Sequence, residues 1–315
     1  MNTFFKKGRC IIFFAFSIGA NMNARRMVSI DAEHDAFVQL DYINLEVNSV
    51  LNNVVTLISN YEPLVSEELQ KTHFDSSTIA YLTQHIVNSD SNIHSFVLSL
   101  DPKISSTQEG FSLLASRDSL GRTIITQTGK DKEYMQTNCY RHTSKTNTGV
   151  WSSPYESYYT PGVWICSYSQ PLHNKSGEFI GMITANISTS RLTQFLGHVN
   201  IRPNALTFII SDDGELLLSD SCHSTLKDSF IARHEESSDT LWQSIEQKMH
   251  AGEHGECTLL NSDETVLYYY SPLSQLQGWS IGVACNKSEI LMGLNKQTRT
   301  VVIFDILVAI CMFLL

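Results

Sequence analysis

The chain has 315 residues, of which 42% are hydrophobic and 17% are charged, and its formal net charge is −10 at pH 7. This composition predicts a folded globular core and excludes an intrinsically disordered chain. The excess of acidic residues, without a basic stripe, excludes nucleic-acid binding, because a phosphate backbone requires clustered Lys and Arg. The length predicts two domains, or one domain with two similar lobes.

Both ends of the chain are strongly apolar. Residues 10–20 form an uncharged apolar run that follows three basic residues. Residues 301–315 form a second run. A membrane-spanning helix needs about 20 apolar residues, and this run reaches that length only if the natural protein continues beyond Leu315. The first run fits a membrane anchor with its start inside the cell, which we favour, or a secretory signal peptide. Either interpretation places residues 28–298 outside the cytoplasm.

Residues 28–60 are predicted to form one long helix. Apolar residues recur there in steps of three and four, at Leu40, Ile43, Val47, Val50, Val54 and Leu57. Such a stripe packs against the helix's own domain, against a second copy of the helix, or against both. We expect this helix to break near Glu62–Pro63, and a second helix to span Ser76–Val87.

The middle of the chain predicts short strands in two groups, joined by tight turns. The first group is His94–Leu100, Phe111–Ser116, Thr123–Gln127, Ile165–Leu172 and Glu178–Ile187, followed by a short helix at Leu192–Leu196. The second group is Leu206–Ile210, Leu216–Ser219, Cys257–Leu260, Val266–Ser271 and Trp279–Cys285, with a helix at Thr240–Met249. Turn sequences at Asn174–Gly177 and Asp212–Gly214 indicate hairpins, so the sheets should be antiparallel and the fold class α+β.

Aromatic residues gather between Trp151 and Tyr168, beside two predicted strands and with few charges among them. Pockets for small molecules are mostly apolar, with a few placed polar groups. The candidate ligand-binding residues are Tyr140, Arg141, Trp151, Tyr155, Tyr158, Trp164, Ser167, Tyr168 and Asn186. The alternative is that part of these rings is ordinary core or surface packing.

Catalysis, cofactors and metals are not expected. The chain has no Gly-x-Ser-x-Gly, no His-Glu-x-x-His and no phosphate-binding loop. His250, His254 and Cys257 have a spacing that suits zinc, but the predicted helix ends near Gly252 and breaks their common face. Cys139 with Cys166, or Cys222 with Cys257, could pair in an oxidising compartment, and isolated thiols are the alternative.

The order of these elements resembles the double Cache (dCache) sensor domain of bacterial transmembrane receptors, over about residues 30–290. The motifs that carry the resemblance are Trp151-Ser-Ser-Pro-Tyr155, Tyr168-Ser-Gln-Pro-Leu172, Gly177–Gly181 with Ala185-Asn-Ile187, Phe208–Ser219, and Tyr270-Ser-Pro-Leu273 with Gly278-Trp279. The resemblance implies two stacked PAS-like lobes behind the long helix, flanked by membrane segments. The implied divisions are a start and anchor at 1–27, the helix at 28–74, a membrane-distal ligand-binding lobe at 75–198, a membrane-proximal lobe at 199–290, and a linker with a second membrane segment at 291–315.

The resemblance also implies a function. Such domains bind a small molecule outside the cell and control a cytoplasmic output module, often as homodimers through the N-terminal helix. The Trp-Ser-x-Pro-Tyr motif looks most like domains fused to PP2C-type serine phosphatases of the RsbU/SpoIIE group, with histidine kinases and chemoreceptors as alternatives. A surface module that holds no ligand, structural or adhesive, is the competing interpretation.

One departure from the family concerns the ligand. Family members that bind amino acids carry Arg-x-Trp-Tyr and a later Asp. Here Thr137 stands at the Arg position, Cys139 and Tyr140 at the Trp-Tyr positions, and Asn186 at the Asp position. We therefore expect a small carboxylate near Arg141, or another polar metabolite without an amine, in preference to an amino acid.

Overall fold

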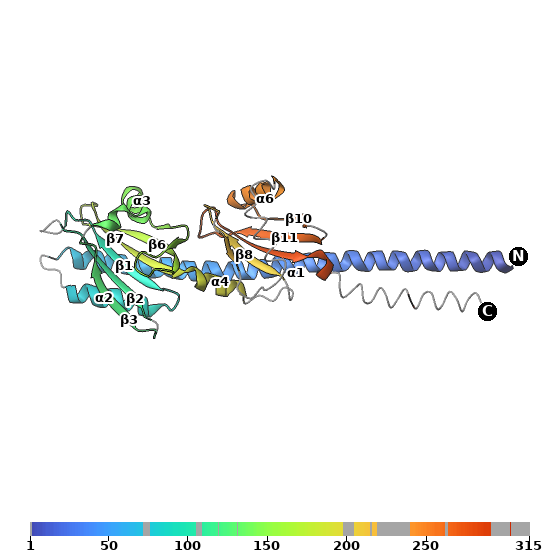
Figure 1. Cartoon of the computed structure of the whole chain (residues 1–315), viewed down its shortest axis with the longest axis horizontal. Coiled ribbons are helices and arrows are strands. Elements are labelled where there is room, and N and C mark those ends of the chain that lie inside the picture. The colour runs from blue at the N-terminus through green and yellow to red at the C-terminus, as the bar shows by residue number, and fades with distance from the viewer. Residues whose placement is uncertain are drawn as a thin grey trace.

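The computed structural model consists of one long helix with two antiparallel sheets packed along it (Figure 1). It describes residues 2–71, 76–104, 109–118, 120–130, 132–197, 205–214, 216–218, 240–261, 264–290 and 303. Helices and antiparallel strands form separate layers, which confirms the predicted α+β class.

Two predicted features concern the membrane. Among the helices of the described residues, none has a stretch that is long and apolar enough to cross a membrane. The predicted second segment, at 301–315, lies outside the described residues apart from Ile303.

The long helix α1 (Asn2–Leu69) extends further than predicted in both directions. It runs through Pro63, so the predicted break near Glu62–Pro63 is wrong. Proline removes one intrahelical hydrogen bond, but Val65 and Leu69 beyond it are buried, and this packing stabilises the last turns. The predicted apolar stripe faces the core: Leu40, Ile43, Val47 and Val54 are fully buried, Val50 is nearly so, and Leu57 is partly buried.

The larger sheet lies at the end of α1 far from the N-terminus, and we call residues 76–188 the distal lobe (Figure 1). In chain order this lobe contains α2 (Ser76–Ser89), β1 (Ser95–Leu100), β2 (Phe111–Arg117), β3 (Thr123–Thr128), the 3-10 helix η1 (Glu133–Gln136), α3 (Asn138–Thr146), β4 (Val150–Trp151), β5 (Tyr155–Glu156), β6 (Trp164–His173) and β7 (Phe179–Ser188). The seven strands are antiparallel in the order β3-β2-β1-β7-β6-β4, and β5 also pairs with β6. Neither η1 nor α3 was predicted.

The hairpin between β6 and β7 forms at the predicted turn. The side-chain oxygen of Asn174 accepts hydrogen bonds from the backbone N–H groups of Ser176 and Glu178, each at 2.9 Å. Gly177 has φ +80°, a conformation that side chains with a Cβ rarely adopt. The turn therefore requires Asn and Gly at these positions, as the sequence indicated.

The two faces of the distal sheet differ in chemistry because side chains alternate along each strand. On β1, Phe96 and Leu98 belong to the core that α1 and α2 cover. Val97 and Ser99 point to the opposite face, where α3 lies (Figure 1). The sheet thus has one apolar face for the core and one more polar face for a site.

The smaller sheet belongs to residues 205–290, which we call the proximal lobe. After the connecting helix α4 (Thr189–Gly197), the lobe contains β8 (Leu206–Ile210), β9 (Leu216–Leu218), α6 (Thr240–His250), β10 (Gly255–Asn261), β11 (Glu264–Pro272), β12 (Ser280–Asn286) and α7 (Lys287–Ile290). Its five strands are antiparallel in the order β10-β11-β12-β8-β9. One face packs on α1, and the other packs on Trp242, Ile245 and Met249 of α6.

Helix α1 makes polar as well as apolar contacts with both lobes. The side-chain nitrogen of Asn44 donates to Ser271 Oγ at 3.1 Å and to the carbonyl oxygen of Pro272 at 3.0 Å, both in the proximal lobe. Near its other end, Gln70 Oε1 accepts a hydrogen bond of 2.9 Å from the backbone N–H of Lys175 in the distal lobe. One rigid element therefore supports both sheets.

The described cysteines Cys139, Cys166, Cys257 and Cys285 are free thiols. Cys166 belongs to the core that faces α1, whereas Cys139 lines a cavity on the opposite face of the sheet, so these two do not pair. Cys222 lies outside the described residues. Among the described residues, no three potential ligands are grouped around a metal position.

Candidate functional site

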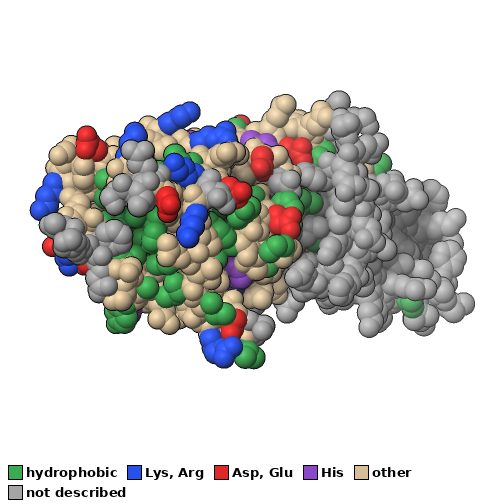
Figure 2. All heavy atoms as spheres, turned by 60° about the vertical axis from the view of Figure 1, so that its left-hand side comes forward, with side chains coloured by type: hydrophobic (Ala, Val, Ile, Leu, Met, Phe, Trp, Pro, Cys, Tyr) green, Lys and Arg blue, Asp and Glu red, His purple; other side chains and the backbone are tan. Residues whose placement is uncertain are grey.

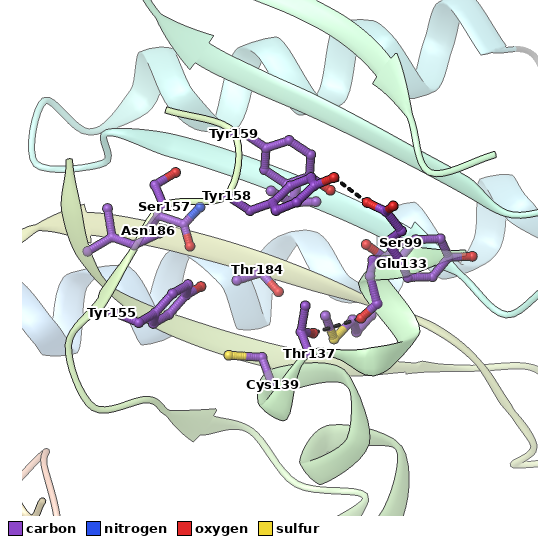
Figure 3. Close-up of a pocket in the computed structure, with 14 residues that line it drawn as sticks. Ser99, Glu133, Thr137, Cys139, Tyr155, Ser157, Tyr158, Tyr159, Thr184 and Asn186 are labelled. Carbon is purple, nitrogen blue, oxygen red and sulfur yellow. Dashed lines mark hydrogen bonds between the residues drawn. The ribbon is translucent and has the colours of Figure 1, made fainter. Parts of the chain in front are cut away.

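A pocket of about 110 Å³ lies on the polar face of the distal sheet, on the side away from α1 and α2 (Figure 3). Its floor is formed by three strands, which contribute Val97 and Ser99 from β1, Ile165 from β6, and Met182, Thr184 and Asn186 from β7. Its walls are formed by η1, the start of α3 and residues 155–159, which contribute Glu133, Tyr134, Thr137, Cys139, Tyr155, Ser157, Tyr158 and Tyr159.

Alternation along the strands explains the floor. Small polar residues share the pocket side with Val97, Ile165 and Met182, and they hydrogen bond across strands. Ser99 Oγ lies 3.2 Å from Ser112 Oγ, and Ser169 Oγ lies 3.0 Å from Thr184 Oγ1. Buried hydroxyl groups are costly unless paired, so these pairs stabilise a polar floor inside the lobe.

A chain of four side chains continues this network at the end of the pocket. The side-chain nitrogen of Asn186 donates to Ser95 Oγ at 2.8 Å, and Ser167 Oγ donates to Asn186 Oδ1 at 2.6 Å. Tyr155 Oη lies 2.6 Å from Ser167 Oγ. Because Ser167 uses its only proton on Asn186, the hydroxyl of Tyr155 must be the donor in this third bond.

Tyr155 is therefore held at the pocket by Ser167, and the thiol of Cys139 also lies within hydrogen-bond reach of its hydroxyl group. Burial is the main reason why the pKa of Tyr155 is raised above its ordinary value, so the hydroxyl keeps its proton at neutral pH. The network fixes which way this hydroxyl points before any ligand arrives.

The wall formed by η1 is anchored to the sheet by Tyr134. Its hydroxyl donates to the carbonyl oxygen of Leu100 at 2.6 Å and accepts from the backbone N–H of Phe111 at 3.3 Å. Next to it, the hydroxyl of Tyr158 donates to Oε2 of Glu133, so two separate segments meet at the edge of the pocket (Figure 3). Both side chains are exposed, which places them at the entrance.

Helix α3 begins at the pocket because Thr137 caps it. Thr137 Oγ1 accepts a hydrogen bond of 3.2 Å from the backbone N–H of Tyr140, the arrangement typical of a helix N-cap. Cys139 follows in the first turn and faces the cavity. Burial is the main reason why the pKa of this thiol is raised, so Cys139 is a neutral part of the wall.

A larger groove of about 590 Å³ adjoins the pocket and reaches the proximal lobe. The two cavities share Thr137, Cys139, Tyr155 and Tyr158. The other residues of the groove include Trp151, Ser153 and Glu156 from the distal lobe, and Asp212 and Asp213 from the turn after β8. The two lobes are thus in contact next to the pocket.

One hydrogen-bonded group makes this contact. Ser153 Oγ donates to Asp212 Oδ1 at 2.8 Å, and Trp279 Nε1 donates to the same oxygen at 3.1 Å. The segment that carries Ser153 also forms the pocket, because Ser152 bonds to the backbone of Ser167 and Tyr155 reaches into the cavity. The segment at 152–155 therefore contributes both to the pocket and to a contact between the lobes.

The structure brings together four of the candidate residues from the sequence. Tyr155 and Asn186 line the pocket, and Ser167 hydrogen bonds to both. Tyr158 stands at the entrance, and Trp151 lies in the adjoining groove.

The other candidates lie elsewhere. Tyr168 lies on the opposite face of β6, because it follows Ser167 and neighbouring side chains alternate along a strand. There it belongs to the core around α1 and packs on Trp151, with the ring centroids 5.4 Å apart. Tyr140 is buried behind the wall, 5.4 Å from the ring of Tyr134. Arg141 and Trp164 are exposed and are not among the residues that line the pocket.

Several pocket residues were not predicted: Ser99, Glu133, Tyr134, Thr137, Tyr159, Met182 and Thr184. They come from segments up to 85 positions apart (184 − 99), so no local spacing connects them. The alternation of Ser95, Val97 and Ser99 with Phe96, Leu98 and Leu100 was the available signal, since it marks one face of β1 as polar.

Comparison with known proteins agrees with this architecture. Residues 79–194 match the family model described as the methyl-accepting chemotaxis protein-like, first PDC sensor domain. No curated protein sequence matches the chain.

Solved structures are similar over most of the chain. The ligand-binding domain of the Campylobacter jejuni chemoreceptor Tlp3, in complex with L-valine, has a TM-score of 0.63 at 11% identity, over 84% of this chain and 97% of that chain. The extracellular domain of the histidine kinase mmHK1S-Z3 has a TM-score of 0.63 at 16% identity, over 85% and 97%. A methyl-accepting chemotaxis protein X has the same TM-score at 14% identity, over 83% and 100%. The chain therefore has the fold of PDC/Cache sensor domains, and the segment that matches the family model covers most of the distal lobe and the first turns of α4.

Proposed function

We propose that this protein is the extracytoplasmic sensor part of a membrane signal-transduction receptor, and that it binds a small molecule in the pocket of the distal lobe. One observation carries this proposal. The segment at 152–155 forms part of the pocket through Tyr155, and it contacts the proximal lobe through the hydrogen bond from Ser153 to Asp212. A ligand that moves this segment changes the contact between the lobes.

The ligand acts by shifting the balance between two arrangements of the lobes. Only a difference in affinity for the two arrangements can shift that balance. Tyr155 is suited to sense the ligand because its hydroxyl is fixed by Ser167 and its oxygen faces the cavity. The signal then passes through the Ser153–Asp212 contact and through α1, which packs on both sheets.

The placement and the output follow from the same proposal. Residues 28–298 lie outside the cytoplasm, and the apolar segments near the two ends hold the protein in the membrane. The similar structures named above come from chemoreceptors and a histidine kinase, so we propose one of these outputs in place of the PP2C-type serine phosphatase expected from the sequence.

We also propose a homodimer through α1. Val38, Tyr42 and Leu45 lie in steps of four and three on one side of the helix and are between 52% and 71% exposed. This spacing is that of a heptad seam between two helices. If a second copy covers the seam, Leu45→Glu should convert a dimer to a monomer in sedimentation experiments on the full chain, and a dimer that persists would exclude this seam.

The proposed ligand site is tested by filling the pocket. Val97 is 7% exposed and lines the floor, so Val97→Phe places a ring in the cavity, whereas the control Val97→Ile adds one methylene group. The full chain in detergent is screened by thermal shift against organic acids, amino acids, amines and sugars. A ligand at 100 times its Kd should stabilise the protein by about 2.7 kcal/mol.

We expect at least one compound to stabilise the wild type and the Val97→Ile variant but not the Val97→Phe variant. If every stabilising compound still acts on Val97→Phe, the pocket is not the ligand site. If no compound stabilises the wild type, a structural or adhesive surface module becomes the better interpretation.

A further inference from the structure

The charged groups around the pocket are of one sign. Of the fourteen described residues that line it, only Glu133 carries a charge at neutral pH. The groove that adjoins it contains three carboxylates, from Glu156, Asp212 and Asp213, and a single histidine, His142. Among the described residues that line either cavity there is no Lys and no Arg. A carboxylate ligand would enter without a cationic partner, which is costly inside a protein.

A further carboxylate, that of Asp101, lies outside the lining of both cavities and acts on two tyrosines in and behind the wall. Burial, and then the charge of Asp101, raise the pKa of Tyr140, and Asp101 also contributes to the raised pKa of Tyr134. A nearby negative charge opposes the formation of a second one, and the same field attracts a cation.

The walls provide two kinds of contact for a cation. Tyr134, Tyr155, Tyr158 and Tyr159 line the cavity, and the face of an aromatic ring attracts an ammonium group. Glu133 supplies the opposite charge at the entrance, and Tyr158 donates to its Oε2, which holds the carboxylate toward the cavity (Figure 3). Within the described part of the chain, Oε1 of Glu133 has no hydrogen-bond partner and is available to an N–H donor.

The expectation of a carboxylate ligand depended on Arg141. That side chain is exposed on α3 and does not line either cavity. The groups available at the floor, from Ser99, Thr184 and Asn186, are uncharged and already hydrogen bonded to their neighbours. They suit a hydroxyl group or an apolar body, and none of the described residues that line either cavity is a Lys or an Arg that could pair with a carboxylate.

We propose that the pocket binds a small organic amine that has no carboxylate group, with its ammonium group between Glu133 and the tyrosine rings. This inference rests on the proposed function, because it names the class of ligand for the same pocket. It differs from an amino-acid site because the described residues that line the pocket and the groove include no Lys and no Arg to pair with a ligand carboxylate.

Three compounds that share one hydrocarbon body test the inference. L-valine carries both charged groups, 2-methylpropan-1-amine carries only the amine, and 3-methylbutanoate carries only the carboxylate. Binding of each to the full chain in detergent is measured by calorimetry at pH 7. The protein variants are Glu133→Gln, which removes the charge, Glu133→Asp, which keeps it, and Glu178→Gln, which removes an exposed charge from the β6–β7 turn of the same lobe.

We expect the amine to bind more tightly than L-valine and 3-methylbutanoate. Its affinity should fall about tenfold in Glu133→Gln, which corresponds to the loss of one charge-assisted hydrogen bond at an exposed position. It should be largely retained in Glu133→Asp and unchanged in Glu178→Gln. Tighter binding of L-valine or 3-methylbutanoate, or an amine affinity that is the same in Glu133→Gln, would overturn the inference.

These outcomes are distinct from a failure of the proposed function. If 3-methylbutanoate or L-valine binds best and its binding is lost in Val97→Phe, the pocket is a ligand site for another class of molecule. If none of the three compounds binds, the inference is overturned, while the wider screen with Val97→Phe still decides whether the pocket holds a ligand.

Discussion

The buried network around Asn186 gives the most demanding test of the pocket's architecture. Asn186 is 3% exposed, and its side chain joins Ser95 of β1 to Ser167 of β6. Asn186→Leu keeps the branched shape and the number of heavy atoms of the side chain but removes both hydrogen bonds. Each bond contributes about 1 kcal/mol net. Ser95 is 2% exposed, and its Oγ has no other hydrogen-bond partner among the described residues. In the variant this buried hydroxyl is left unsatisfied, which lowers the free energy of unfolding by about 1 kcal/mol more.

We therefore expect Asn186→Leu to lower the free energy of unfolding by about 3 kcal/mol. Thr184→Val is the matched control, because it lies two residues away on the same face of β7 and removes one hydrogen bond, to Ser169. Its cost should be about half as large. Guanidinium unfolding of the full chain, followed by tryptophan fluorescence, measures both, with Trp151 and Trp164 reporting on the distal lobe.

A double-mutant cycle isolates the bond between Asn186 and Ser167. Replacing both partners by apolar groups costs less than the sum of the two single changes, because neither leaves a buried polar atom unpaired. We expect Ser167→Ala to be less destabilising in the Asn186→Leu background than in the wild type, by about 1 kcal/mol. If the two effects simply add, or if Asn186→Leu costs no more than Thr184→Val, the network does not stabilise the lobe as described.

Three further changes test other parts of the structure. Burial, and then the charge of Arg117, lower the pKa of His94 below its ordinary value of about 6.5, so the unfolded chain binds this proton more tightly. The Tm should therefore fall as the pH drops from 7 to 5, and it should fall less in His94→Gln than in the wild type. An equal fall in Tm in the two proteins would contradict this role of His94. Arg117 donates hydrogen bonds to the carbonyl oxygens of Val87, Asp90 and Ile93. Arg117→Lys should therefore lower the free energy of unfolding, measured in guanidinium, by about 2 kcal/mol. A change near zero would show that these bonds do not hold α2 to β2. Ser153→Ala should lower the free energy of unfolding by less than about 1 kcal/mol, because the hydrogen bond that it removes is exposed, but hydrogen exchange should become faster across residues 152–160. Asp212→Asn keeps the acceptor oxygen and is the control. If Ser153→Ala leaves the exchange unchanged, the lobe contact is refuted.

Most of the fold was predictable because its signals are local. Strands of alternating or apolar residues were bounded by turns such as Asn174–Gly177, where an Asn side chain and a Gly with positive φ make the turn. The prediction of a helix break near Glu62–Pro63 was wrong, because buried residues on both sides of the proline stabilise the continuous helix. Helix α3 was missed because only Tyr140 and Thr143 of its nine residues are buried, too few for a periodic stripe.

The site was only partly predictable. In the aromatic stretch, Tyr155 lines the cavity, and Ser167 of the following strand hydrogen bonds to it. The same stretch suggested Tyr168, which faces the core, because the sequence shows that neighbours alternate but not which face the helices cover. Glu133 and Tyr134 come from a single 3-10 turn with no spacing pattern, so only the folded chain connects them to the pocket.

In the proposed receptor, the position of the pocket also limits how a signal would pass from it to the rest of the protein. Helix α1 is continuous beneath both sheets and is buried against each, so a large rotation between the lobes would break an extended apolar core. The contact at Ser153 and Asp212 is different, because it consists of one exposed hydrogen bond between side chains. Breaking or remaking it costs about 1 kcal/mol, which corresponds to a shift of about fivefold in an equilibrium. A ligand that contacts Tyr155, two residues from Ser153, can therefore change this contact with an ordinary difference in affinity, whereas displacement of α1 requires several such contacts to act together.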